Sequence, residues 1–512
     1  MTWTRREFMV NGALTAGAVS FAGCASAKKE NTVTAAQPSA RISYFEANFG
    51  VTPEMIHKVL ARSLAHGGKW GELFFEHSRI GVVSLKDSIV SEAYTNISLG
   101  MGVRAVVDDQ IGFAFTESLM LPDMLQAADA AAAIAHGADA GAVKPQHWLD
   151  LKKHWYDQSV HWDNVEIARA ADLLRHIEAM TRAKSTEITK VQVGIRWTQR
   201  SILVTASDGT YAEDSQPYAA LSLTVVMERG GEIQSNWDSL AILGGFETYT
   251  DDARINKLID NVIKNTELLF DAVKPKGGEW PVVLGAGSSG ILLHEAIGHG
   301  LEAEFNRKKI SIYADKLNKK VAEANVTVVD SGENMNSRGA LNVDDEGTPS
   351  QKTVLIENGV LRSYMHDKIS ANHYGIAPTG SGRRESYKHY PNPRMRTTYM
   401  ENGDASFDDL IKDVKYGVYC TRFLNGQVYI GAGDYTFYVK NGFLIEDGKI
   451  TAPIKDVNLI GNGPDTLSKI TRIANDFAYS EGGWTCGKDG QSIPVSLGMP
   501  SVLVSSISVG GN

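Results

Sequence analysis

Residues 280–300 read WPVVLGAGSSGILLHEAIGHG, and this stretch predicts a strand, a tight turn and a helix in succession. The apolar run from Trp280 to Leu284 is typical of a short buried strand. The glycines of residues 285–290 predict the turn, after which a helix begins. The cluster KPKGG at residues 274–278 comes directly before the strand and indicates a domain boundary. We therefore expect a second domain that begins near residue 279 and carries a helix close to the junction.

The residues before this boundary predict a mixed N-terminal α/β domain. Apolar side chains recur with helical spacing over residues 53–66, 121–136, 164–184 and 252–273. Strand-like runs cover residues 72–76, 79–85, 99–107, 111–116, 190–207 and 218–228. From about residue 325 onwards, short strand-like runs are separated by Asn-Gly and Asp-Gly pairs, which are turn signals. The predicted fold class is α+β, with an N-terminal domain over residues 49–278 and a β-rich C-terminal domain over residues 279–512.

The first 48 residues predict a targeting segment and a linker. Arg5 and Arg6 stand before an aromatic residue, and residues 9–27 are uncharged, as in a twin-arginine export signal. An N-terminal helix with two incidental arginines is the alternative. Cleavage has two candidate sites: the small residues at 25–27, and a lipobox-like FAGC that ends at Cys24 but begins with an unusual Phe. We expect residues 1–27 to direct export to the periplasm and residues 28–48 to form a linker, with lipid anchoring at Cys24 left open.

The composition argues against some classes of partner. Hydrophobic residues make up 43% of the 512 residues and charged residues 22%, which is ordinary for a globular protein. The formal net charge of -9 gives no support for a nucleic-acid partner, which usually needs a basic face. Beyond the N-terminus no apolar run approaches the roughly 18 residues of a membrane span. Membrane contact is therefore expected only through a lipid at Cys24.

The predicted helix after residue 290 carries His294, Glu295 and His299. The familiar zinc helix places its two His four residues apart, so that both imidazoles face the same way. Here the spacing is five, and on a regular helix such positions point about 140° from each other. A one-residue π-bulge would realign the two imidazoles, and Gly298 is able to absorb the distortion. The alternative is a pair of core or capping His that bind no metal.

Cys486 is the strongest candidate for a third ligand. It lies in the glycine-rich loop GGWTCGKDG of residues 482–490, where Lys488 would favour the thiolate. Two His and one Cys suit a catalytic Zn²⁺ ion, which uses three protein ligands and one water. Glu295 is then free to act as general base on that water. A disulfide between Cys420 and Cys486 would remove the sulfur ligand, and we predict that the two do not pair.

Five segments of the chain resemble the TldD/PmbA metallopeptidases, specifically their metal-bearing, TldD-like branch. The segments are HEAIGHGLEAEF (294–305), NVTVVDSG (325–332), NVDDEGTPSQKTVLIENGVLRSYMHD (342–367), PTGSGRRESYKHYPNPRMRTTYM (378–400) and TCGKDGQSIPVSLGMPSVLV (485–504). The resemblance covers roughly residues 49–508. The chain departs from the family in three ways: it begins with an export signal, and Ser381 and Thr397 stand where the family is expected to have Asn.

The resemblance implies a site and an activity. The family's metal ligands fall on His294, His299 and Cys486, and its catalytic residue falls on Glu295. Family members cleave ribosomally made precursor peptides and unfolded polypeptides. They form dimers that enclose the active sites, so this chain is expected to form a homodimer or a heterodimer with a paralogue that lacks the metal motif. The implied function is zinc-dependent hydrolysis of peptide bonds. A non-catalytic peptide-binding subunit with a structural zinc is the alternative, and that zinc would need a fourth protein ligand.

The loop of residues 379–396 supplies candidate substrate-binding residues. Arg383 and Arg384 suit a peptide carboxylate or carbonyl, and Tyr387 or His389 would stabilise a tetrahedral oxyanion. The alternative is a structural loop whose arginines pair with the acidic run at residues 344–346. That run lacks the alternating ligand spacing of a calcium loop, so we interpret it as a solvated or Arg-paired turn.

Overall fold

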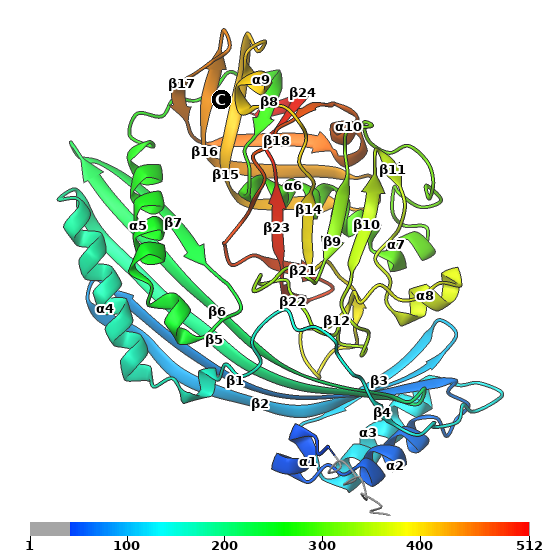
Figure 1. Ribbon diagram of the computed structural model, residues 1–512. Coiled ribbons are helices and arrows are strands. Elements are labelled where there is room, and N and C mark those ends of the chain that lie inside the picture. The colour runs from blue at the N-terminus through cyan, green and yellow to red at the C-terminus, as the bar shows by residue number, and fades with distance from the viewer. Residues whose placement is uncertain (1–40, 511–512) are drawn as a thin grey trace, which may run out of the picture. The chain divides into compact units, whose positions relative to one another are not determined.

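The structure is a computed structural model that describes residues 41–510 (Figure 1). The described residues from Ser43 onwards form one unit by their internal contacts. The predicted export signal, Cys24 and most of the predicted linker lie outside the described residues. The last residues of that linker belong to a short helix, because Ser43 caps a helical turn that begins at Tyr44.

The described residues form ten α-helices and 24 strands. The helices are α1 (Tyr44–Phe49), α2 (Pro53–Ser63), α3 (Leu121–Ile134), α4 (Ile167–Lys184), α5 (Asp252–Glu267), α6 (Ile291–Leu293), α7 (Ala303–Arg307), α8 (Lys368–Tyr374), α9 (Phe407–Ile411) and α10 (Gly463–Ser468). The strands are β1 (Trp70–Lys86), β2 (Ile89–Val107), β3 (Gln110–Thr116), β4 (His147–Trp148), β5 (Ile188–Ala206), β6 (Thr210–Arg229), β7 (Glu232–Leu240), β8 (Gly278–Leu284), β9 (Val328–Ser331), β10 (Lys352–Glu357), β11 (Val360–Leu361), β12 (Gly382–Arg383), β13 (Asn392–Pro393), β14 (Thr397–Met400), β15 (Tyr416–Tyr429), β16 (Asp434–Glu446), β17 (Lys449–Ile454), β18 (Val457–Asn462), β19 (Ile470–Ile473), β20 (Ala478–Tyr479), β21 (Thr485–Lys488), β22 (Gln491–Pro494), β23 (Ser496–Met499) and β24 (Val502–Gly510).

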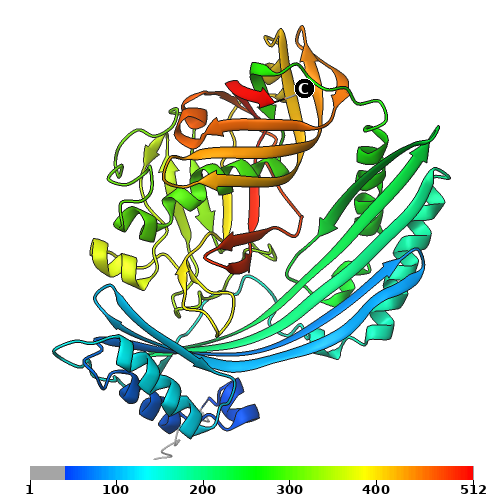
Figure 2. The same ribbon diagram turned by 180° about the vertical axis from the view of Figure 1, so that it is seen from behind.

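The first sheet has long strands in the order β3-β2-β1-β5-β6-β4, with β7 paired to β6. Side chains alternate between the two faces of a strand. Leu73 and Phe75 of β1 lie in the core that α2 and α3 cover, whereas Phe74 contacts Val343 and Tyr387 of the C-terminal domain. Helices α2 and α3 and the C-terminal domain thus lie on opposite faces of this sheet, as both ribbon views show (Figures 1 and 2).

The C-terminal domain contains two larger sheets with the orders β11-β10-β9-β14-β23-β20 and β15-β8-β24-β18-β16-β17. Their inner faces share one hydrophobic core, which includes Val328 from the first of these sheets and Val418 from the second. Leu292, which precedes His294, and Ile297, which lies between His294 and His299, belong to the same core. The helical segment is therefore fixed between two sheets, and the predicted α+β fold class is confirmed.

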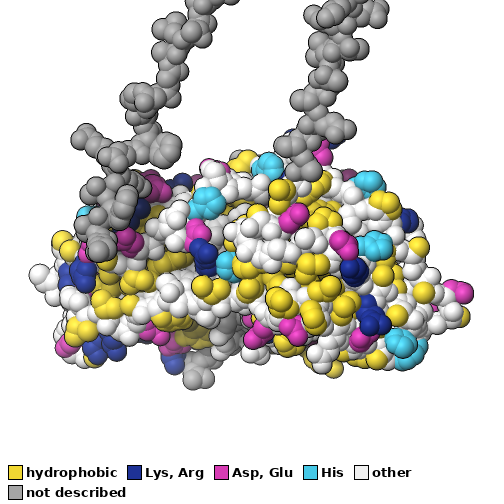
Figure 3. All heavy atoms as spheres, turned by 90° about the horizontal axis from the view of Figure 1, so that it is seen from below, with side chains coloured by type: hydrophobic (Ala, Val, Ile, Leu, Met, Phe, Trp, Pro, Cys, Tyr) yellow, Lys and Arg dark blue, Asp and Glu magenta, His cyan; other side chains and the backbone are white. Residues whose placement is uncertain are grey.

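In Figure 3, charged side chains of both signs are scattered among hydrophobic ones on the face that is seen there, without a basic concentration. Among residues 41–510, no helix combines the length and the apolar character that a membrane span requires.

Buried charges connect the first sheet to the C-terminal domain. Arg104 of β2 lies opposite Glu72 of β1 and donates to Glu72 and Glu346 at 2.8 and 2.6 Å. Arg384 forms an ion pair with the same Glu72. All four side chains are buried, so each charge depends on these partners for compensation.

We expect Arg384→Ala to lower the free energy of unfolding by about 3 kcal/mol. This is the lower end of the range for breaking a buried ion pair, because Glu72 keeps Arg104 as a partner. Urea unfolding followed by tryptophan fluorescence measures the change. Arg362→Ala, which removes an exposed pair with Glu357, is the control and should cost less than about 1 kcal/mol. Equal stability of Arg384→Ala and the unaltered protein would contradict a structural role for Arg384.

Candidate metal centre

The helical segment of residues 291–301 is irregular where the two His occur. The α-helical turn α6 changes to a π-helix, η4, over His294–Gly298, and a 3₁₀ turn, η5, follows over His299–Leu301. The backbone N–H of His299 donates to the carbonyl oxygen of His294, which is the five-residue hydrogen bond of a π-helix. The predicted π-bulge is confirmed. It brings side chains five residues apart onto one side of the segment.

Gly298 is required for close packing. Its φ of -56° is ordinary for a helix, so left-handed backbone freedom is not the reason for this glycine. A Cβ atom at this position would lie 2.0 Å from the sulfur of the buried Met395 and 3.3 Å from the carbonyl oxygen of Leu293. The missing side chain allows the π-helix to approach the loop that Met395 belongs to.

We expect Gly298→Ala to lower the free energy of unfolding by about 1–3 kcal/mol, because the added methyl group overpacks a filled core. It should also weaken zinc binding, since His299 follows directly. Urea unfolding and a zinc titration measure the two effects. Gly487→Ala is the matched control: it lies beside Cys486, but its added Cβ meets open space. The two variants behaving alike would contradict the role of the Met395 contact.

Cys486 is carried by a hairpin, where the sequence analysis expected a loop. Strands β21 and β22 pair around Asp489 and Gly490, whose φ values of 51° and 73° are those of a tight hairpin turn. Residues of β21 alternate between exposed and buried, so Cys486 and Lys488 both point inward. The Asp-Gly turn determines this register and directs the thiol toward the helical segment.

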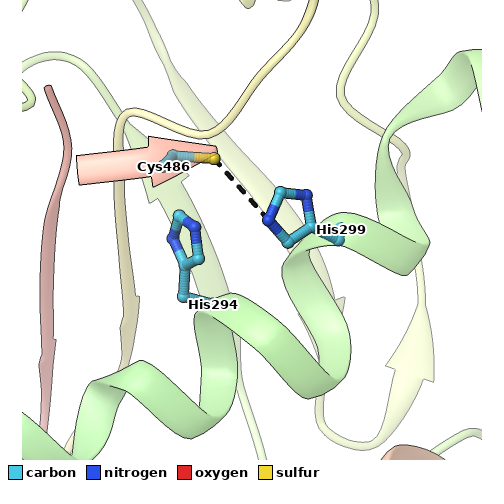
Figure 4. Close-up of side chains that lie close together, drawn as sticks. All are labelled: His294, His299 and Cys486. Atoms are coloured by element: carbon cyan, nitrogen blue, oxygen red, sulfur yellow. Dashed lines mark hydrogen bonds between the residues drawn. The ribbon is translucent and has the colours of Figure 1, made fainter. Parts of the chain in front are cut away.

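His294, His299 and Cys486 converge in the buried core (Figure 4). One potential ligand atom from each residue lies within 4.8 Å of the others. The Cys486 Sγ atom is 3.6 Å from the His299 Nε2 atom. Two such ligands of one tetrahedral zinc ion would be about 3.6 Å apart, given usual zinc–sulfur and zinc–nitrogen bond lengths. The Nδ1 atom of His294 is buried without a hydrogen-bond partner. The donor set and this unsatisfied atom fit a metal ion.

The electrostatics of the cluster favour a thiolate. Burial raises the pKa of the Cys486 thiol, but His294 and His299 outweigh burial and hold this pKa well below its ordinary value. Burial likewise raises the pKa of Glu295, an effect that the two His partly offset. Glu295 lies beside the cluster, with its Oε2 atom 3.9 Å from the Nε2 atom of His299. A carboxylate with a raised pKa at this distance is suited to proton transfer near neutral pH.

Glu302 contacts the Nδ1 atom of His299, and Lys488 in turn contacts Glu302. The Glu302 Oε2 atom lies 3.2 Å from the Nδ1 atom of His299, so Nε2 is left to face the sulfur. Lys488 contacts Glu302 and Glu304 at 3.1 and 3.0 Å. Although burial alone would raise it, Lys488 and His299 lower the pKa of Glu302 to about 2. From the sequence we expected Lys488 to favour the Cys486 thiolate. In the structure it instead compensates the charges of two buried carboxylates, Glu302 and Glu304.

Arg394 contacts the thiol. Its Nη2 atom donates to the carbonyl oxygen of Cys486 at 2.7 Å and lies 3.1 Å from the Cys486 Sγ atom. The sequence places Arg394 in the loop after Thr379 but offers no signal for this pairing, because the two residues are brought together only by tertiary structure.

Among the described residues, the other predicted loop residues form no hydrogen bond or ion pair with the three candidate ligands. Arg383 donates to the carbonyl oxygens of Met395 and Pro494, and Arg384 is part of the buried ion pairs described above. Tyr387 is buried against β1, and the His389 Nδ1 atom lies 3.2 Å from the hydroxyl of Ser386. A role for these four residues in binding substrate stays a prediction. Cys420 is buried in β15 and is not bonded to Cys486.

Family models match three parts of the chain: "PmbA/TldA metallopeptidase domain 1" at residues 71–135, the "central domain" at 160–270 and the "C-terminal domain" at 277–511. The "Metalloprotease TldD homolog" of Haemophilus influenzae is 37% identical over 447 residues, which are 86% of this chain and 93% of that protein. The chain belongs to the TldD/PmbA family of metallopeptidases. A "Zinc metalloprotease TldD homolog" of Saccharolobus solfataricus is 33% identical over 57% of this chain and 65% of that protein.

Solved structures show the same fold. TldE from Thermococcus kodakarensis superimposes on this TldD/PmbA protein with a TM-score of 0.71 and 20% identity, over 89% of this chain and all of that one. A putative modulator of a DNA gyrase from Thermotoga maritima gives a TM-score of 0.70 with 18% identity, over 89% of this chain and 99% of that chain.

Proposed function

We propose that this TldD/PmbA protein is a zinc-dependent peptidase that hydrolyses bonds in extended or unfolded peptides. The observation that carries the proposal is the convergence of His294, His299 and Cys486, with Glu295 beside them. The name of the relative from Saccharolobus solfataricus supports zinc as the metal.

Zinc held by these residues would supply a Lewis acid for the scissile carbonyl and lower the pKa of a water molecule. Residues of the protein would transfer the protons and orient the ligands. The Glu295 carboxylate accepts a proton from the attacking water and later returns it to the leaving amine. Glu302 holds His299 in the tautomer that presents Nε2. Arg394 and the two imidazoles keep Cys486 in its ligating form.

The alternative function is a non-catalytic peptide-binding subunit with a structural zinc. Such a site would be closed by a fourth protein ligand. Among the described residues the cluster has three members, which favours catalysis. Export through residues 1–27, and assembly as a homodimer or with a paralogue, stay predictions.

A peptide-library digest of the full chain tests the proposal. We expect the zinc-loaded protein to cleave unstructured peptides, chelation to stop cleavage, and added zinc to restore it. Elemental analysis should find one zinc ion per chain. A fully zinc-loaded protein that leaves every peptide intact would overturn the proposal and favour the structural alternative.

A further inference from the structure

A cavity of about 820 Å³ lies between the residues that follow β7 and the loop of residues 333–338. Its volume is in the range of ligand-binding sites. A second cavity of about 580 Å³ shares Arg254 and residues 479–481 of its wall. Residues 479–481 border both cavities, and the chain continues from them into β21, which carries Cys486. The wall that the two cavities share is therefore continuous in the chain with the hairpin of the metal centre.

Arg338 lines the first cavity, and its side chain forms one hydrogen bond with the described residues. Its Nε atom donates to the carbonyl oxygen of Trp484 at 3.1 Å. The described residues provide no acceptor for its two Nη atoms and no acidic partner for its charge. The side chain is partly buried and forms part of the cavity wall.

The surroundings of Arg338 make its charge costly. Burial lowers the pKa of the guanidinium, and the nearby cations Arg383 and Arg196 lower it further, against an opposite effect of Tyr218 and Tyr249. A partly desolvated cation without a counterion is unfavourable, and an anion in the cavity would compensate it.

Most other charged groups in the wall of the cavity already have partners. Arg254 pairs with Asp251 at 3.7 Å, and Glu481 pairs with Lys257 at 2.9 Å. The Asp157 carboxylate accepts from Ser159. Glu333 also lines the cavity, and the described residues show no ion pair between Glu333 and Arg338. Arg338 is thus the cation among these lining residues that is open to an external anion.

We propose that Arg338 binds a carboxylate group of the peptide substrate, either the C-terminal carboxylate or an acidic side chain close to it. The inference rests on the proposed peptidase function. A guanidinium fork matches a carboxylate in a bidentate geometry. Trp484, which Arg338 contacts, is two residues from Cys486, and two residues of an extended strand span about 7 Å. A short peptide therefore reaches from Arg338 to the metal centre.

Three peptides of one sequence test this proposal on the zinc-loaded Glu295→Gln protein, which is expected to bind but not to cleave. One has a free C-terminus, one a C-terminal amide, and one a C-terminal amide with Glu as its last residue; none has another acidic residue. Fluorescence anisotropy measures the dissociation constants. We expect the first or the third peptide to bind about 10- to 100-fold more tightly than the second, the scale of one charge-assisted contact. Which of the two binds tightly identifies the source of the carboxylate.

Arg338→Met should abolish this preference. Arg254→Met, which alters a paired arginine in the same wall, should preserve it. Equal binding of all three peptides, or a preference that survives Arg338→Met, would overturn the proposal. The comparison of peptides on a chain with Arg338 intact is decisive even if Arg338→Met fails to fold. Carboxylate-dependent binding by a protein that cleaves nothing would reject the peptidase function and leave this inference standing.

Discussion

Glu295→Gln should lower the turnover number for peptide cleavage by about 10²- to 10⁴-fold, the usual contribution of a general base. Gln has nearly the same shape, so packing beside the π-helix is retained, but its amide cannot accept the proton from water. The three ligands are untouched, so the zinc content should stay at one ion per chain. Because burial disfavours the charge of Glu295, the variant should be at least as stable as the unaltered protein.

Steady-state cleavage of a fluorogenic peptide measures the loss, and elemental analysis checks the metal. Glu178→Gln is the matched control, because Glu178 is a buried glutamate on α4 that bonds to Ser88 and Arg182 and is not a member of the cluster. It should change stability without changing turnover. Full activity of Glu295→Gln would show that another group accepts the proton, and the proposed mechanism would fail.

Local patterns predicted most of the N-terminal elements. The helix expected over residues 53–66 is observed at Pro53–Ser63, because Thr52 caps its start and Pro53 occupies the first turn. The strand-like runs at residues 190–207 and 218–228 correspond to β5 and β6. Two short strand-like runs proved to be parts of one strand, β1, since both pair with β2 in a nearly continuous register. Period-two alternation does not reveal where such runs join.

The candidate site was predictable where the local spacing was unusual. The five-residue separation of His294 and His299 cannot serve one ion on a regular helix, and so it predicted the π-bulge. The contacts of Glu302, Arg394 and Lys488 were not predictable, because they depend on how the β21–β22 hairpin docks against the helical segment. No periodicity or local motif encodes that docking.

Cys486→Ser should weaken zinc binding by about 10²- to 10³-fold. Apparent zinc-binding free energies of about 10–16 kcal/mol are spread over four ligands in structural sites, so one ligand accounts for about 3 kcal/mol. Serine keeps the size of the side chain and can still accept a hydrogen bond from Arg394, so the hairpin should remain folded. Its hydroxyl is a poor zinc ligand at neutral pH because it holds its proton. Competition with a chromophoric chelator measures the affinity.

The second thiol provides the control for this prediction. Cys420 is as fully buried as Cys486, but among the described residues no His offsets the effect of burial, which raises the pKa of its thiol. Cys420→Ser should therefore reduce stability and leave zinc affinity unchanged. A thiol count after denaturation in chelator without reductant should find three reactive groups in the full chain, or two where Cys24 has been removed or carries a lipid, because Cys420 and Cys486 are not paired. If Cys486→Ser binds zinc as tightly as Cys420→Ser, the sulfur is not a ligand, and the convergence on which the peptidase function depends has no chemical role.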